Sequence, residues 1–175
     1  GLVVNGKNGR LYDKFRNRLM LPVIDTRGDV VAFGSRVLDK SEPKYMNSSE
    51  TPVYSKRRVL YGLNLAKKSK RPNIILCEGN LDIVTLHQAG FDNAVASMGT
   101  ALTVEQTRLL SRFTKELVLC YDNDNAGKIA TERALQILNG SEFSVKVLQL
   151  PRRLVDGEYI KQDADDFIKL QGPDA

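Results

Sequence analysis

The 175-residue sequence contains no tryptophan, one histidine and only two cysteines, Cys77 and Cys120. These are too few for a usual structural zinc site, which takes four Cys or His ligands, so we expect no zinc in this chain. Each cysteine ends an apolar run, a position that suits a small buried side chain with a reduced thiol. The pattern is typical of a reducing compartment, and we expect a cytoplasmic protein.

The sequence also lacks a long hydrophobic run. No apolar stretch approaches the roughly 20 residues that a membrane-spanning helix needs, and the first six residues lack the basic and apolar regions of a signal peptide. We therefore expect no membrane partner and no export. With 42% hydrophobic and 27% charged residues, the composition suits one globular domain, or one domain and part of a second.

Positive and negative charges are unevenly distributed along the chain. Residues 1–70 carry 15 Lys or Arg against 6 Asp or Glu, a net charge of +9, whereas residues 71–175 carry 11 against 15, a net charge of −4. A basic part joined to an acidic part suggests one surface for a polyanion and another for metal ions. The alternative is that the basic residues only keep the protein soluble.

The first 70 residues predict a basic α+β region. Residues 17–37 alternate in polarity around the turn-forming segment 25–28, which favours a β-hairpin. Residues 38–58 have little periodicity and predict a long irregular stretch. Residues 59–69 predict a short helix, followed by the basic cluster 67–72, which we interpret as a linker.

From residue 73 the pattern alternates between strands and helices. Asparagine, glycine and a Thr103–Gln106 capping box mark several of the helix ends. Such a series predicts an α/β fold, with a mostly parallel sheet covered by helices on both faces. The predicted strands are 73–77, 94–97, 116–121 and 145–150, and the predicted helices are about 80–89, 103–112 and 126–138.

Five acidic residues lie at three points where apolar runs stop. They are Glu78, the pair Asp122 and Asp124, and the pair Asp163 and Asp165. In an open α/β sheet, ligands bind beyond the carboxyl ends of the strands. Carboxylates collected there would repel one another unless a hard divalent cation held them together. The sequence therefore predicts a magnesium site, and such sites usually bind phosphates.

Two neighbours of Glu78 have supporting positions. Gly79 allows the backbone to approach a ligand closely. Asp82 lies one helical turn beyond Glu78 and should face the same crevice.

Local structure offers another explanation for each acidic point. Glu78 could simply meet the positive end of a helix dipole. An Asx-turn or a helix N-cap would explain one of Asp122 and Asp124, but not both. The segment 163–166 alone could be a solvated surface run.

The acidic motifs and several other motifs of the chain resemble those of a known family. Glu78 to Asp82 (EGNLD) and Asp122 to Asp124 (DND) resemble the Toprim signature, which primases, type IA and type II topoisomerases and some nucleases share. Several further motifs, in the same order along nearly the whole chain, resemble the catalytic core of bacterial replicative primases of the DnaG type. They are YDKFRNR at 12–18, FGSRV at 33–37, PKYMNS at 43–48, KRRVLYGL at 56–63, ASMGT at 96–100 and YDNDNAG at 121–127.

The resemblance implies a domain organisation. It implies a partial basic N-terminal subdomain of the primase core at 1–70, a Toprim domain at 71–155 and an acidic segment at 156–175 that completes the metal site. On this resemblance we expect an excised piece of a larger protein, without the zinc-binding and helicase-binding domains of primases.

The resemblance also implies an activity, the synthesis of short RNA primers on single-stranded DNA from ribonucleoside triphosphates. Two or three Mg²⁺ ions, for which Mn²⁺ can substitute, are implied. Glu78, Asp122 and Asp124 would be the central catalytic ligands, Asp163 and Asp165 would hold the triphosphate-side ion, and Gly79 and Asp82 would support them. Spacing leaves open whether Glu78 is instead a general base.

Six residues are candidates for contacts with template and nucleotide phosphates, because Arg and Lys suit phosphate oxygens. They are Arg16, Arg18, Arg36, Lys44, Asn47 and Lys56. The expected partners are the DNA template, the nucleotides, the RNA product and, through a domain outside this chain, a replicative helicase. The alternatives are another Toprim protein, such as a topoisomerase or nuclease, and a non-catalytic nucleotide-binding module.

Overall fold

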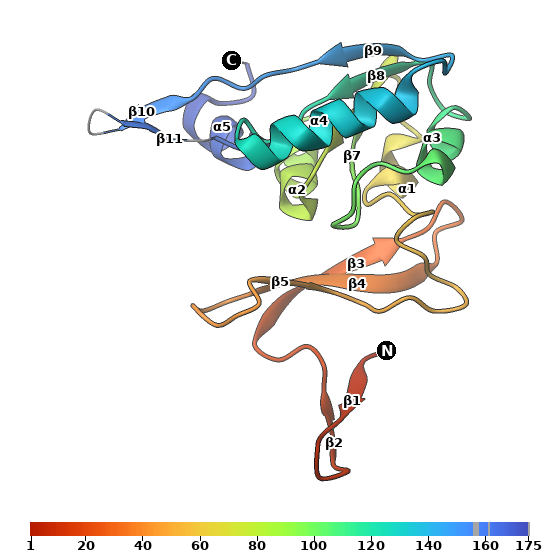
Figure 1. Ribbon diagram of the computed structural model, residues 1–175, viewed down its shortest axis with the longest axis vertical. Helices are drawn as coiled ribbons and strands as arrows, with labels where there is room; N and C mark the ends of the chain where they lie inside the picture. Colours follow the sequence, from red (N-terminus) through yellow and green to blue (C-terminus); the bar gives the residue numbers. More distant parts are fainter. Residues whose placement is uncertain (156–157, 161, 175) are drawn as a thin grey trace. The chain divides into compact units, whose positions relative to one another are not determined.

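The structure is a computed structural model that describes residues 1–155, 158–160 and 162–174. Two compact units make up the chain, Gly1–Ser55 and Lys56–Ala175 (Figure 1).

The first unit is antiparallel. Strands β1 (Val3–Asn5) and β2 (Leu11–Asp13) form one hairpin, and β3 (Arg18–Ile24), β4 (Val30–Val37) and β5 (Tyr45–Asn47) form a sheet in that order. The predicted hairpin at 17–37 is confirmed, and its turn forms because the Asp25 carboxylate accepts hydrogen bonds from three following backbone N–H groups. Strand β5 lies in the stretch 38–58, which was expected to be irregular. The sequence did not predict this strand because its three residues are too few to show a clear alternation.

The second unit contains a parallel sheet of four strands, in the order β7-β6-β8-β9. The seven elements from residue 73 to residue 147 follow the predicted alternation of strands and helices, so the α/β class is confirmed. The strands are β6 (Asn73–Cys77), β7 (Ala94–Ala96), β8 (Glu116–Leu119) and β9 (Ser144–Val147), and a separate hairpin joins β10 (Arg153–Val155) and β11 (Glu158–Ile160). The helices are α1 (Leu63–Ala66), α2 (Asn80–Gln88), α3 (Val104–Leu110), α4 (Asn125–Leu138) and α5 (Ala164–Gln171).

Helices cover both faces of this sheet because its strands are apolar on both faces. Ile74 and Leu76 of β6 face a core that includes residues of α1, α3 and α4. Ile75 and Cys77, which alternate with them, face a second core that includes residues of α2 and α5. The long α4 and the strands beneath it are visible in Figure 1.

The predicted capping box of α3 is confirmed. Thr103 Oγ1 accepts from the Gln106 N–H at 3.1 Å, and Gln106 Oε1 accepts from the Thr103 N–H at 3.1 Å. The fully buried Gln106 amide also donates to the carbonyls of Lys56 and Val59, which fixes the segment before α1. Helix α1 is shorter than the predicted 59–69. None of the helices in the described part of the chain combines the length and apolarity that a bilayer crossing requires.

Candidate active site

The carboxyl ends of two neighbouring strands bring Glu78 and Asp122 to one edge of the sheet. Strands β6 and β8 are parallel and adjacent, with Leu76 opposite Leu119, and the Cys120 N–H donates to the Leu76 carbonyl at 2.9 Å. Glu78 follows the end of β6, and Asp122 follows the end of β8. Both acids are half-buried. The predicted position of these two acids at the carboxyl edge is therefore confirmed.

Asp124 caps the helix that leaves this edge. Its Oδ1 accepts from the Gly127 N–H at 2.8 Å, so Asp124 is the N-cap of α4. A Cβ atom on Gly127 would lie 2.0 Å from the Asp122 carbonyl oxygen, so only glycine allows the helix to start this close to Asp122. The N-cap explanation is thus right for Asp124, and Gly127 explains the spacing of the motif.

Three aspartates gather at the start of α5. Asp163 is the N-cap, and its Oδ1 accepts from the Asp166 N–H at 2.7 Å. Asp163, Asp165 and Asp166 each offer one carboxylate oxygen within 4.8 Å of the others. Three anionic oxygens without sulfur or imidazole suit a hard divalent cation. This donor set therefore fits the kind of metal ion that the sequence predicted.

Asp82 connects the start of α2 with the start of α5. Its Oδ2 accepts from the Gly79 N–H at 3.1 Å, and its Oδ1 accepts from the Asp165 N–H at 3.3 Å. Burial, together with the negative charges of Asp163 and Asp122, raises the pKa of Asp82 to about 7. The Asp82 side chain therefore lies close enough to Asp122 and Asp163, which belong to two of the predicted metal-binding segments, to feel their negative charges.

The structure brings the predicted acids to one region but does not place all of them in one cluster. Within residues 1–155, 158–160 and 162–174, the group close enough to share an ion is Asp163, Asp165 and Asp166. Glu78, Asp122 and Asp124 lie outside that group. Their role as metal ligands stays a prediction.

A hollow of about 510 Å³ adjoins Glu78. One wall is the loop after β7, and another is the face of α4 that carries Ala126, Ala130 and Arg133 at helical spacing. Arg133 is exposed and is the cation of this wall. The hollow therefore pairs a carboxylate at one side with a guanidinium at the other. Its remaining lining residues are Ser97, Gly99, Thr100, Ala101, Tyr121 and Ile129.

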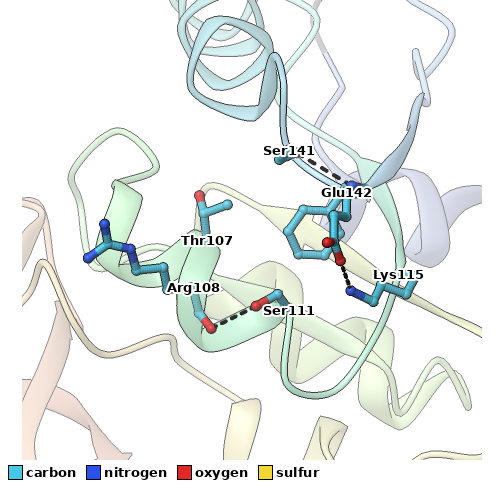
Figure 2. Close-up of a pocket in the computed structure, with 7 residues that line it drawn as sticks. Thr107, Arg108, Ser111, Lys115, Ser141 and Glu142 are labelled. Atoms are coloured by element: carbon cyan, nitrogen blue, oxygen red, sulfur yellow. Dashed lines mark hydrogen bonds and ion pairs between the residues drawn. The ribbon is translucent and has the colours of Figure 1, made fainter.

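A second hollow, of about 320 Å³, lies near the residues that begin β8 and β9, at the opposite edge of the sheet (Figure 2). Its hydroxyl groups donate to nearby backbone carbonyls, as in the bond from Ser111 Oγ to the Arg108 carbonyl at 3.0 Å. Lys115 pairs with Glu142 across it. Because these hydroxyl groups and Lys115 already have partners within the protein, the hollow offers few groups to a ligand. Its lining is Thr107, Arg108, Ser111, Lys115, Ser141, Glu142 and Phe143.

The predicted phosphate-binding residues of the first unit divide between two faces of its sheet. Arg36 of β4 lies opposite Tyr45 of β5, with its guanidinium 6.0 Å from the ring centre, and Asn47 shares this face. Lys44 and Arg36 both line a hollow of about 410 Å³. Arg18 lies opposite Val37 and therefore on the other face.

The two other predicted phosphate contacts lie outside this sheet. Arg16 precedes β3, and its guanidinium lies 5.0 Å from the ring centre of Tyr12. Lys56 belongs to the second unit.

Sequence reasoning missed Asp166, Arg133 and two residues that hold Asp165. Thr85 Oγ1 donates to Asp165 Oδ1, and Lys169 Nζ lies 2.6 Å from Asp165 Oδ2. The four-residue spacing from Asp165 to Lys169 is a signal that could have predicted the second contact. The first contact joins residues that are 80 positions apart, and no local pattern indicates it.

The parallel sheet, its helices on both faces and the acids at its carboxyl edge define a Toprim-like domain. Comparison with protein families agrees: residues 75–168 match the family described as Toprim-like, and residues 1–67 match the family described as DNA primase catalytic core, N-terminal domain. The chain belongs to the DnaG-type family of bacterial DNA primases, as part of the catalytic core.

Individual relatives support this family. The DNA primase of Clostridium acetobutylicum is 46% identical over 100% of this chain, and that of Listeria monocytogenes is 42% identical over 99%. The chain spans only 28% and 27% of these two relatives.

Solved structures are similar over nearly the whole chain. A DNA primase domain from Pseudomonas aeruginosa has a TM-score of 0.86 and 40% identity, with 99% of this chain and 54% of that chain covered. The Aquifex aeolicus primase, with its zinc-binding and RNA polymerase domains, has a TM-score of 0.87 and 36% identity, with 99% and 42% covered. A DnaG primase catalytic domain bound to ssDNA has a TM-score of 0.85 and 39% identity, with 98% and 54% covered.

Proposed function

We propose that this chain is the metal-binding part of a DNA-directed RNA polymerase that makes short RNA primers on single-stranded DNA during replication. The observation that carries this proposal is the set of acids at the carboxyl edge of a Toprim-like sheet, in a chain whose relatives are named DNA primase. The similar DnaG catalytic domain that was solved with ssDNA supports a DNA template as partner.

Mg²⁺, with Mn²⁺ as a substitute, is the cofactor that the oxygen-only donor set favours. Glu78, Asp122 and Asp124 would hold one of two or three ions, and Asp163 and Asp165 another. When bound, such ions activate the attacking 3′-hydroxyl and neutralise the triphosphate and the leaving pyrophosphate.

Local structure suits the acids to this role. Asp124 and Asp163 each use one oxygen to cap a helix, which fixes the direction of the carboxylate. The N-termini of α2, α4 and α5 all meet these acids, and their helix dipoles partly offset the negative charge. Gly79 and Asp82 act through positioning, because the Gly79 N–H and the Asp165 N–H both donate to Asp82.

The domain division and the remaining partners are part of the same proposal. Residues 1–70 would contribute a basic subdomain, 71–155 the Toprim domain, and 156–175 the segment that completes the metal site. The nucleic acid and nucleotide phosphates would contact the basic residues that the sequence singled out. Ribonucleoside triphosphates, the RNA product, a helicase bound through another domain and a cytoplasmic location follow from the primase assignment. These residues are Arg16, Arg18, Arg36, Lys44 and Lys56, together with the uncharged Asn47.

A chimeric enzyme tests the proposal, since the chain spans only part of its relatives. The matching segment of the Clostridium acetobutylicum primase is replaced by this chain, and primer synthesis on single-stranded DNA is measured. We expect activity in the chimera and a loss of at least about 100-fold in its Asp122→Ala variant, the order that removal of one catalytic electrostatic group costs.

Asp92→Asn is the matched control, because Asp92 is an exposed acid just before β7, at the amino edge of the sheet. It should retain activity. Full synthesis by the Asp122→Ala chimera would contradict the metal-site proposal. Nucleotide binding by an active-site-intact chimera that makes no primers would instead favour the non-catalytic module.

A further inference from the structure

Asp165 is held from two sides by this chain. It lies in the first turn of α5, and its side chain is 20% exposed. Oδ1 accepts a hydrogen bond from the Thr85 hydroxyl of α2, and Oδ2 lies 2.6 Å from the Lys169 ammonium of α5. The two contacts differ in a way that suggests different roles.

The Thr85 contact is rigid. Thr85 is half-buried in α2, and a β-branched side chain in a helix has few χ1 rotamers. Helices α2 and α5 share one apolar core, in which Ile83 and Leu86 are buried with Ala164. A hydroxyl donor on one packed helix therefore fixes the orientation of a carboxylate on the other. The hydrogen bond is charge-assisted, which strengthens it.

The Lys169 contact is exposed by comparison. The Lys169 side chain is 65% exposed, and its pair with Asp165 has the i,i+4 spacing with the acid first. Exposed pairs of this kind are weak and sensitive to salt. The ammonium also partly offsets the negative charge of Asp163, Asp165 and Asp166, since it contacts Asp165.

We propose that Lys169 is a counter-cation for Asp165 that leaves it when a divalent ion binds. In the same proposal, Thr85 is a positioning residue that fixes the orientation of the Asp165 carboxylate. This inference rests on the proposed metal site. Oδ2 cannot bind the ammonium at 2.6 Å and a metal ion at the same time with full strength, because two cations there repel each other. Lys169 therefore stabilises the metal-free protein and weakens metal binding, whereas Thr85 supports metal binding.

Mn²⁺ titration of the complete 175-residue chain tests both roles, with the free-ion signal in electron paramagnetic resonance as the readout and no catalysis required. Lys169→Gln should bind Mn²⁺ roughly fivefold more tightly, the order that one unit charge at contact distance gives in water. With a metal chelator present, the Tm of Lys169→Gln should be about 1–2 °C below that of the wild type. Thr85→Val should bind Mn²⁺ roughly fivefold more weakly, and Thr85→Ser should restore the affinity because it restores the donor.

Two further variants separate this inference from the metal site itself. Lys146→Gln is the matched control, because it removes the same charge from a lysine that pairs with Glu116 near the start of β8, and it should change Mn²⁺ affinity less than Lys169→Gln. Asp165→Asn should weaken Mn²⁺ binding. If it does, but Lys169→Gln binds no more tightly than the wild type, the counter-cation role is wrong. If Asp165→Asn binds Mn²⁺ as the wild type does, the metal-site proposal is wrong at Asp165, and this inference is then wrong as well.

Discussion

Asp82 is a buried carboxyl group whose ionisation should control the stability of the metal-free protein. Its folded-state pKa is raised to about 7 from 3.8, mainly by burial. A raised carboxyl pKa means that the folded state binds the proton more tightly, so its stabilisation is complete below about pH 4 and is lost as pH rises through 7. The loss is at most about 4 kcal/mol, from the size of the pKa shift.

Asp82→Asn should remove this pH dependence, because the amide stays neutral. Its single carbonyl oxygen can accept from only one of the Gly79 and Asp165 N–H groups, which adds a destabilisation that does not depend on pH. With a metal chelator present, we expect the melting temperature of the variant to rise relative to that of the wild type between pH 4.5 and pH 8. Thermal unfolding across this pH range measures the difference. A constant offset between the two proteins at all pH values would show that Asp82 is not the titrating group.

Asp124 combines a structural role with a proposed catalytic one, and two substitutions separate them. Asparagine caps helices as well as aspartate does, whereas alanine costs about 1 kcal/mol at an N-cap. Asp124→Asn should therefore keep the free energy of unfolding but weaken Mn²⁺ binding, and Asp124→Ala should lose both. Denaturant unfolding and Mn²⁺ titration measure the two roles. Unchanged Mn²⁺ affinity in both variants would leave Asp124 as a cap only.

Sequence spacing identified Glu78, Asp122 and Asp124, because they follow apolar runs that become buried strands. Asp163 and Asp165 come after the exposed strand β11, so their prediction depended on the family resemblance. Spacing did not identify what holds these acids. The N-cap role of Asp163 depends on α5, and the signal for this helix start, an Asp at the N-cap with two more in the first turn, was interpreted only as a metal site or a surface run. The hydrogen bond from Thr85 depends on the packing of α2 against α5, which only the folded chain determines.

Some helices and strands could also be predicted from the sequence, and others could not. The strands at 73–77 and 116–119 were predictable, because long apolar runs between helices identify parallel strands. Three-residue strands such as β1, β5 and β10 were not, since three residues show little of the two-residue alternation and, unlike β7, these strands do not stand between two helices. Their pairing comes from neighbours along the chain rather than from their own composition.

The junction between β8 and α4 depends on Gly127, the residue that lets the helix start against Asp122. An added Cβ would lie 2.0 Å from the Asp122 carbonyl oxygen, and backbone atoms cannot move aside as a side chain could. Gly127→Ala should destabilise the protein by about 2 kcal/mol or more and shift Asp122. Gly140→Ala is a useful comparison, because it meets no atom within 4 Å and carries only the strain of a positive φ of 75°. Equal losses of unfolding free energy for the two variants would contradict this account.

At the scale of the whole molecule, the charge asymmetry does not follow the compact units. Gly1–Ser55 contains nine Lys or Arg and six Asp or Glu, a net charge of +3, and Lys56–Ala175 contains 17 and 15, a net charge of +2. The difference from the division at residue 70 comes from six basic residues between 56 and 70, which belong to the second unit. Basic residues that could contact a polyanion are therefore present in both units rather than in one basic domain.

Binding of single-stranded DNA should reveal this distribution through its salt dependence. Each phosphate that a Lys or Arg neutralises contributes about −0.7 to the slope of log K against log salt for a single strand. Arg36→Ala and Lys44→Ala in the first unit, and Lys56→Ala in the second, should each make the slope shallower by up to this amount, and the triple variant should approach their sum. Fluorescence anisotropy of a labelled oligonucleotide between 50 and 200 mM salt, the range over which such contacts dominate affinity, measures it. Lys115→Ala is the control, since Lys115 already pairs with Glu142 at the far edge of the sheet. A slope that responds only to the first-unit variants would place the nucleic-acid surface in that unit alone.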